Sequence, residues 1–191
     1  MRDFHLPGRS AVFATNGMCA TSHPLAAAAA LEILKSGGNA VDAAIAGAVL
    51  LGICEPQMTG LGGDMFALIQ KDPSADVVAL NGSGRAPQAA NAATLRARGL
   101  SAVPIHSTDA ITIPGAVDGF CRMAKDFGNL SLAEVLAPAI YYTRLGVPVA
   151  PKVAFDWDQS TALLQGVARE KFLISGAAPK SGQIFASPSQ A

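Results

Sequence analysis

The stretch SGGNAVDAAIAGAVLLGICEP, residues 36–56, predicts a buried helix over residues 40–54. Asn39 is a favoured N-cap residue, and Asp42 places a carboxylate near the positive end of the helix dipole. After Asp42 nearly every residue is small or aliphatic, so the helix is apolar on all sides and should be buried on most faces. The Glu-Pro dipeptide that follows ends it.

Another helix is predicted just before this one, over Pro24–Lys35, because proline suits a first turn and the glycine pair 37–38 ends the helix. Its alanines and the small residues of the second helix would let the two axes approach closely. Ahead of it, small and β-branched residues from Val12 to Thr21 predict a short strand.

A hairpin is predicted after the helix pair, over residues 64–81. MFALIQK, residues 65–71, has a strand pattern, Asp72-Pro73-Ser74 makes a turn, and Val77–Leu80 supplies the second strand.

The rest of the chain is predicted to be mainly helical. A short surface helix is predicted within residues 88–100, then an extended piece at 110–114 and a helix from Pro114 and Gly115 to Phe127. The next helix has a capping box of Ser131 and Glu134, contains Pro138 and ends at Gly146. A helical stretch from Pro151 to about Leu173 follows, and Ser175–Ala191 is predicted to be a loop or loose end. The order of helix pair, hairpin and helices indicates an α+β fold instead of a βαβ series.

The composition is typical of a folded chain, and its positive and negative charges balance. Half of the 191 residues are hydrophobic, and 14 basic residues balance 14 acidic ones. Nucleic acid is therefore not the expected partner, because its non-specific binding needs a basic footprint. A membrane is not expected either, since the longest apolar run, Ala43–Cys54, is shorter than the roughly 20 residues that span a bilayer.

The first residues, Met1–Arg9, lack the apolar segment of a secretory signal, so a cytoplasmic location is expected, or a periplasmic one if a leader was removed. Three widely spaced cysteines make no CxxC pair, and an odd count argues against a disulfide framework. Reduced thiols agree with the cytoplasmic expectation.

The glycine-rich GLGGD, residues 60–64, could suggest a phosphate site. It leads from a helix into a strand, however, whereas phosphate-binding glycine loops lead from a strand into a helix. We interpret it as a structural turn.

The histidines do not predict a metal site, because their spacing matches no ligand motif. His5 and His106 are expected at the surface. His23, beside a proline, is interpreted as a helix-start residue, with a catalytic role as the alternative.

No complete nucleophilic apparatus is visible, and no GxSxG elbow is present. Cys19 lies four residues before His23, so a thiolate pair is one reading, but packing among small residues is the other and is favoured. Cys54 ends the buried helix and should behave as a small hydrophobe, and Cys121 has no visible partner.

The best candidate for ligand recognition is Arg85 in NGSGRAP, residues 81–87. Its planar fork of donors matches a carboxylate bidentately, and the small residues before it let a ligand approach. The alternative is an ordinary exposed loop arginine. Asp64 and Asp118 are interpreted as turn or helix-end residues, with a general-base role as the alternative.

Several segments taken together resemble the N-terminal part of the γ-glutamyltranspeptidase family. They are GMCATSHPLAAAAALEILKSGGNAVDAAIAGAVLLGICEPQMTGLGGDMFALI, NGSGRAP, ITIPGAVDGF and SLAEVLAPAI, in family order from Arg9 to about Val149. The combination of GGNAVDAA, EPQ-x-x-G-x-GG and LAEVLAPAI is highly specific.

This resemblance implies an N-terminal nucleophile hydrolase with an αββα sandwich, of which residues 1–191 are the N-terminal portion of the large subunit. Such enzymes cut their own precursor, and a threonine at the head of the small subunit attacks the γ-glutamyl amide of glutathione and similar compounds. The group then passes to water or to an amino acid. Arg85 would bind the α-carboxylate, no catalytic residue would lie in this chain, and no cofactor or metal is implied. Its partners would be the small γ-glutamyl substrate and the small subunit, and the chain alone would be inactive.

The sequence also departs from the family pattern. No Thr-Thr-His type of processing site occurs before Ala191, Asp64 stands where many members have glycine, and Cys19 differs as well. A related acylase or amidohydrolase acting on another acyl-amide is therefore an alternative, and so is a non-catalytic binding or scaffold fragment.

Overall fold

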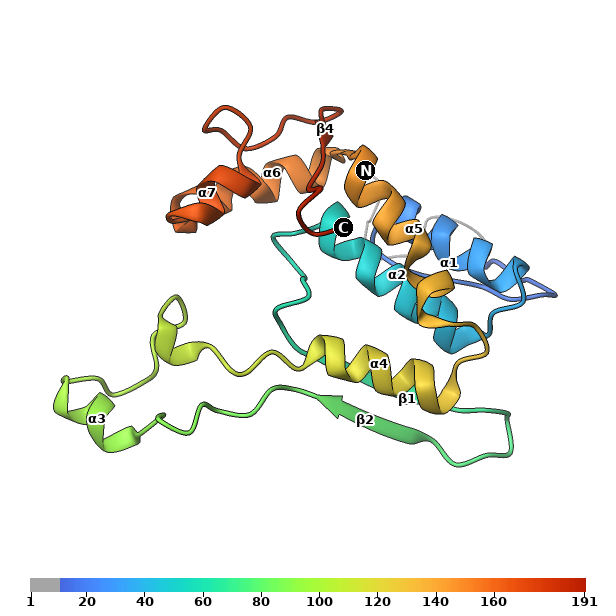
Figure 1. Cartoon of the computed structure of the whole chain (residues 1–191), viewed down its shortest axis with the longest axis horizontal. Coiled ribbons are helices and arrows are strands. Elements are labelled where there is room, and N and C mark those ends of the chain that lie inside the picture. Colours follow the sequence, from blue (N-terminus) through green and yellow to red (C-terminus); the bar gives the residue numbers. More distant parts are fainter. Residues whose placement is uncertain (1–10) are drawn as a thin grey trace.

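The computed structural model describes residues 11–191, and its elements follow the α+β order that the sequence predicts (Figure 1). The longer elements are α1 (Pro24–Lys35), α2 (Ala40–Cys54), β1 (Met65–Ile69), β2 (Val78–Gly82), α4 (Ala116–Phe127), α5 (Leu132–Leu145) and α6 (Pro151–Ser160). The shorter ones are α3 (Ala92–Ala97), β3 (Val147–Pro148), α7 (Val167–Phe172), β4 (Ile184–Phe185) and two 3₁₀ turns at Thr108–Ala110 and Thr161–Leu163.

Helices α1 and α2 begin and end where the sequence predicts, and they lie side by side (Figure 1). Nδ1 of His23 accepts a hydrogen bond from the Leu25 N–H at 3.2 Å and caps α1, which confirms the helix-start interpretation. Buried alanines of α1 face α2, and a Cβ atom at Gly47 would lie only 3.5 Å from the Ala26 carbonyl oxygen. The close approach of the two helices is therefore confirmed.

The carboxylate of Asp42 is completely buried at the start of α2, where it joins two distant parts of the chain. Its Oδ2 accepts hydrogen bonds from the N–H groups of Asn39 (2.9 Å), Asn129 (3.0 Å) and Leu130 (3.3 Å). In return the Asn39 amide donates to the Phe127 carbonyl oxygen at 2.6 Å. These bonds to one oxygen offset part of the cost of burying the carboxylate, whose Oδ1 has no hydrogen-bond partner among the described residues. The start of α2 is thereby fixed to the link between α4 and α5.

Strands β1 and β2 form the predicted antiparallel hairpin, with Met65 opposite Gly82 and Ile69 opposite Val78. The second strand lies slightly later in the chain than predicted. Met65 and Ile69 are buried toward the helices, while Phe66 and Leu68 point the other way and are 69% and 79% exposed. Within the described residues, the hairpin thus has one covered face and one open apolar face.

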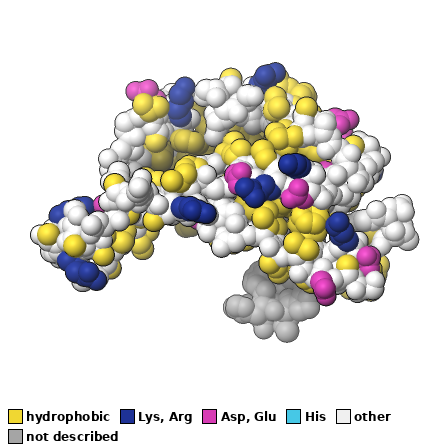
Figure 2. All heavy atoms as spheres, turned by 60° about the horizontal axis from the view of Figure 1, so that its bottom comes forward, with side chains coloured by type: hydrophobic (Ala, Val, Ile, Leu, Met, Phe, Trp, Pro, Cys, Tyr) yellow, Lys and Arg dark blue, Asp and Glu magenta, His cyan; other side chains and the backbone are white. Residues whose placement is uncertain are grey.

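The side of the molecule that lies at the bottom of Figure 1 carries many exposed hydrophobic side chains, with charges of both signs between them (Figure 2). This mixture of charges agrees with the balanced composition of the chain.

Helix α4 lies on the hairpin because it carries a glycine at the contact. A Cβ atom at Gly119 would lie 2.5 Å from Sδ of Met65, so a larger residue at this position would require the Met65 side chain to move. Helix α5 begins with the predicted capping box, in which the Ser131 hydroxyl and N–H both donate to the Glu134 carboxylate and lower its pKa.

Two predictions about secondary structure are wrong. Residues 12–21 form no strand. Among the described residues no other strand pairs with their backbone, and a β-branched composition alone does not make a strand. The predicted continuous helix from Pro151 to Leu173 is broken after Ser160 by a 3₁₀ turn and by Gly166, whose φ of 51° is suited to glycine.

The segment 175–191 has little regular structure, yet it is packed on the chain. Ile184 and Phe185 pair antiparallel with Val147 and Pro148, and the buried Phe185 ring meets the Trp157 ring at 4.7 Å between centroids. None of the helices in the described residues combines the length and apolar character that crossing a membrane requires.

Replacing Asp42 with alanine should lower the free energy of unfolding by about 3 kcal/mol or more, because three buried N–H groups lose their acceptor. Asp42→Asn keeps one acceptor oxygen and should cost less. Urea unfolding followed by circular dichroism measures the change. The exposed Asp158→Ala on α6 is the control, expected within about 0.5 kcal/mol of the unmodified protein. Equal stability of Asp42→Ala and the control would contradict the role given to this carboxylate.

Candidate functional site

Three loops meet beside the open end of the hairpin. The first precedes β1 at residues 60–64, the second follows β2 at 83–85, and the third precedes α4 at 112–115. The Gly63 carbonyl oxygen accepts hydrogen bonds from the N–H groups of Gly115 (3.1 Å) and Ala116 (3.0 Å), and the Ile113 N–H donates to the Arg85 carbonyl oxygen at 2.9 Å. Backbone bonds therefore hold the three loops together; we call this place the loop junction.

Asp64 adds a side-chain tie to the loop junction. Its Oδ1 accepts a hydrogen bond from the Gly84 N–H at 3.2 Å and another from the Thr112 hydroxyl at 3.4 Å. Asp64 is exposed and lies between the turn at residues 61–63 and β1, close to where the turn interpretation placed it. The GLGGD motif is accordingly part of a loop-to-loop contact.

Glycine is required at two positions of the loop junction. A Cβ atom at Gly84 would overlap the Ile113 carbonyl oxygen, and one at Gly115 would overlap the Gly82 carbonyl oxygen. The segments can approach this closely only because neither residue has a side chain.

A pocket of about 450 Å³ opens at the loop junction and includes Arg85. Across it, Asp118 and Arg122 of α4 form an exposed ion pair with 2.9 Å between Oδ2 and Nε. Arg85 is exposed, and no carboxylate among residues 11–191 forms a salt bridge with it. The pocket therefore offers a guanidinium to an anionic group. Asp118 lies in the first turn of α4, as its interpretation as a helix-end residue requires.

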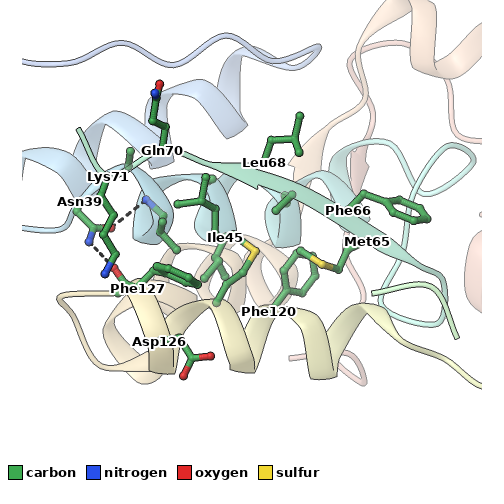
Figure 3. A pocket seen from close by; sticks show the side chains of 18 of the residues that line it. Asn39, Ile45, Met65, Phe66, Leu68, Gln70, Lys71, Phe120, Asp126 and Phe127 are labelled. Atoms are coloured by element: carbon green, nitrogen blue, oxygen red, sulfur yellow. Dashed lines mark hydrogen bonds between the residues drawn. The ribbon is translucent and has the colours of Figure 1, made fainter. Parts of the chain in front are cut away.

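A larger hollow of about 990 Å³ lies between β1, α2 and α4 (Figure 3). Its wall mixes apolar and polar side chains, with Ile45, Phe120 and Phe127 around the centre, and Lys71 stands over the Phe127 ring at 5.2 Å. Histidine, cysteine and serine are absent from its lining in the described part of the chain. Thr59, Asp64 and Asp126 are part of this lining, but no hydrogen bond joins the Thr59 hydroxyl to either carboxylate in the described residues.

The predicted histidine and cysteine candidates are not brought together into a catalytic pair. Nδ1 of His23 is already bonded to the Leu25 N–H, and Cys19 packs at the edge of the apolar core. The favoured reading of Cys19 as a packing residue agrees with this arrangement. His106 is exposed as expected, whereas His5 lies outside the described residues.

Cys54 is 2% exposed at the end of α2, as predicted for a buried hydrophobe. Burial, with a smaller effect of the neighbouring Glu55 charge, raises the pKa of the thiol to about 12. A neutral thiol is a poor nucleophile. Cys121 is exposed, and no disulfide joins the cysteines of the described chain.

No group of three or more His, Cys, Asp or Glu side chains in residues 11–191 is placed to hold a metal ion. The sequence singled out Arg85 as a candidate, but it did not indicate that Thr112 and Arg122 lie near it. The signal for the loop junction was available in the glycines at 84 and 115, which mark close backbone approach.

Comparison with known proteins gives a consistent picture. The sequence model of the gamma-glutamyltranspeptidase family matches residues 26–191. A glutathione hydrolase-like proenzyme of Bacillus subtilis, YwrD, is 39% identical over 177 residues, covering 91% of this chain and 33% of its own. The oxamate amidohydrolase proenzyme of Klebsiella pneumoniae is 36% identical over 186 residues, covering 93% of this chain and 34% of its own.

Among solved structures, cephalosporin acylase from Bacillus halodurans superposes with a TM-score of 0.87 at 40% identity. That alignment covers 97% of this chain and 36% of the acylase chain. The chain thus spans about a third of the length of the curated relatives it matches.

At about pH 8, a disulfide reagent such as Ellman's reagent should label Cys121 of the folded protein quickly and Cys54 hardly at all, because the thiolate is the reacting form. The raised pKa of Cys54 keeps its thiol neutral well above this pH. In denaturant, all three thiols should react. Labelling of Cys54 in the folded protein as fast as Cys121, located by peptide mass analysis, would contradict the burial argument.

Proposed function

This chain belongs to the gamma-glutamyltranspeptidase family, and from that premise we propose that residues 1–191 form the N-terminal portion of the large subunit of an amide-cleaving hydrolase. Hydrolase chemistry is common to the names of its relatives, which are a glutathione hydrolase-like protein, an amidohydrolase and an acylase. The chain spans about a third of the curated relatives, and the activity is proposed for the complete enzyme.

The fold of that longer protein is proposed to be the αββα sandwich of N-terminal nucleophile hydrolases. The open face of the hairpin supports this, since Phe66 and Leu68 are largely exposed on the side away from the helices. Apolar side chains on an outer sheet face are covered when a second layer packs on it.

The nucleophile is proposed to be a threonine that heads a small subunit cut from the same precursor. Support comes from the loop junction and the larger hollow, whose described lining contains neither a histidine nor a cysteine, and where the Thr112 hydroxyl meets the Asp64 carboxylate only at 3.4 Å. The names of two relatives also describe proenzymes. An N-terminal threonine can supply its own amine as the base.

Intact-mass analysis of the protein purified from its own source should find a companion chain that begins with threonine. Terminal sequencing by mass spectrometry identifies its first residue. If this chain is found without a companion, and no longer precursor is present, threonine chemistry is excluded and a binding or scaffold role takes its place.

Arg85 is proposed to bind a carboxylate of the acyl group. The observation that carries this proposal is the exposed guanidinium in a pocket of about 450 Å³, without a salt-bridge partner among the described residues. A guanidinium binds a carboxylate through two parallel charge-assisted hydrogen bonds, which also orient the substrate. In a γ-glutamyl amide this group would be the α-carboxylate, and the acyl group would pass to water or to an amino acid.

A second candidate is an enzyme that acts on a different acyl-amide. Two relatives favour it. The oxamate amidohydrolase is 36% identical to this chain, and the cephalosporin acylase is 40% identical. The same arginine would then hold the carboxylate of another acyl group. Hydrolysis rates of a γ-glutamyl anilide, the matching glutaryl anilide and oxamate distinguish the two candidates directly.

In the complete enzyme, Arg85→Lys should raise KM for a carboxylate-bearing substrate about 10-fold or more, because a point charge cannot replace the bidentate fork. The change in kcat should be smaller. Steady-state kinetics with the preferred anilide measures both constants.

Two controls accompany this variant. Arg96→Lys, on the exposed surface of α3, should leave KM unchanged. The matching butyryl anilide, which lacks the carboxylate, should show no difference between the unmodified enzyme and Arg85→Lys. A KM for the carboxylate substrate that is equal in the two enzymes would overturn the role of Arg85.

A further inference from the structure

We propose that Asp64 is a positioning residue for Arg85, which it orients by holding the backbone of Gly84. This inference rests on the proposed function of Arg85 as the carboxylate-binding residue, and it deepens it. Asp64 does not itself touch the substrate in this proposal. Its role is to fix the direction from which the guanidinium enters the pocket.

The backbone around Arg85 is held on both sides. On the N-terminal side, the Gly84 N–H donates to Oδ1 of Asp64 at 3.2 Å, and on the C-terminal side the Arg85 carbonyl oxygen accepts from the Ile113 N–H at 2.9 Å. Of these two ties, only the first depends on a side chain. A substitution at Asp64 can therefore release one side of Arg85 and leave the other intact.

Asp64 is itself held from two directions, so it can act as a fixed point. The Thr112 hydroxyl donates to the same Oδ1 atom at 3.4 Å, and the preceding Gly63 carbonyl oxygen is bonded to the first residues of α4. Gly84 has no room for a side chain beside Ile113, so its segment lies directly on the third loop. The backbone at Arg85 is thereby fixed relative to α4, so Arg85 does not lie on a free loop.

The direction in which KM changes when the Asp64 carboxylate is removed distinguishes a positioning role from an electrostatic one. The Asp64 carboxylate is exposed and bonded one residue away from Arg85, so its negative charge opposes the binding of an anionic substrate. If charge alone mattered, removing the carboxylate would lower KM. If Asp64 positions the guanidinium, removing its acceptor raises KM, because a small misplacement of a binding group is costly.

The test compares Asp64→Ala with Asp64→Asn in the complete enzyme. Asp64→Ala removes the acceptor and should raise KM for the carboxylate substrate about 10-fold with kcat changed by less than about 3-fold. Asp64→Asn keeps a carbonyl oxygen for the Gly84 N–H and should return KM to that of the unmodified enzyme or below it, since the charge is gone. Asp76→Ala, an exposed aspartate in the turn between β1 and β2, is the matched control and should change neither constant.

A double variant completes the design. If Asp64 acts through Arg85, adding Asp64→Ala to Arg85→Lys should raise KM by less than about 2-fold beyond Arg85→Lys alone. An additive increase would overturn the inference. A lower or unchanged KM in Asp64→Ala would overturn it too, and so would a fall in thermal stability and kcat without a change in KM, which marks a purely structural role.

The failure of this inference is distinguishable from failure of the proposed function. If Arg85→Lys leaves KM unchanged, the role of Arg85 itself fails and the positioning role falls with it. If Arg85→Lys raises KM but Asp64→Ala does not, the carboxylate site stands and only the positioning role is wrong.

Discussion

The buried carboxylate of Asp42 is the contact on which the rest of the described structure depends. It accepts the N–H groups at the start of its own helix and those of the link between α4 and α5, which is far away in the sequence. A charge in the interior is tolerable only while its donors are in place, so this arrangement has little freedom to change. Gly128 is part of the same constraint, because a Cβ atom there would lie 2.6 Å from Oδ1 of Asp42.

The constraint reaches the candidate site through α4. One end of this helix is fixed near Asp42, Gly119 near its other end lies directly on the Met65 side chain, and its first residue bonds to the Gly63 carbonyl oxygen. The loop after β2 is then held against the loop before α4. Arg85 therefore occupies a loop whose backbone is tied to the core, which suits a residue that must present its guanidinium in one direction.

The sequence indicated best those features that depend on neighbours along the chain. The caps at His23, Asn39 and Ser131 use contacts within a few residues, and the structure has all three. One of the two errors, the strand predicted at the start of the chain, came where a partner from elsewhere decides. The residues from Val12 to Thr21 have strand composition, but no strand in the described chain adjoins them. Phe185 also depends on a distant partner, because it packs on the Trp157 ring although its own segment has no regular pattern.

The sequence by itself determined the α+β order, the helix pair, the hairpin and the arginine that follows it, because caps, glycines and apolar periodicity act over short distances. It also carried the family motifs. Only the tertiary structure decided that Asp64 bonds to Gly84, that Thr112 joins them and that Arg122 faces the same pocket as Arg85. These residues lie on three loops and on α4, and their meeting depends on how the hairpin and α4 pack, which no local pattern encodes.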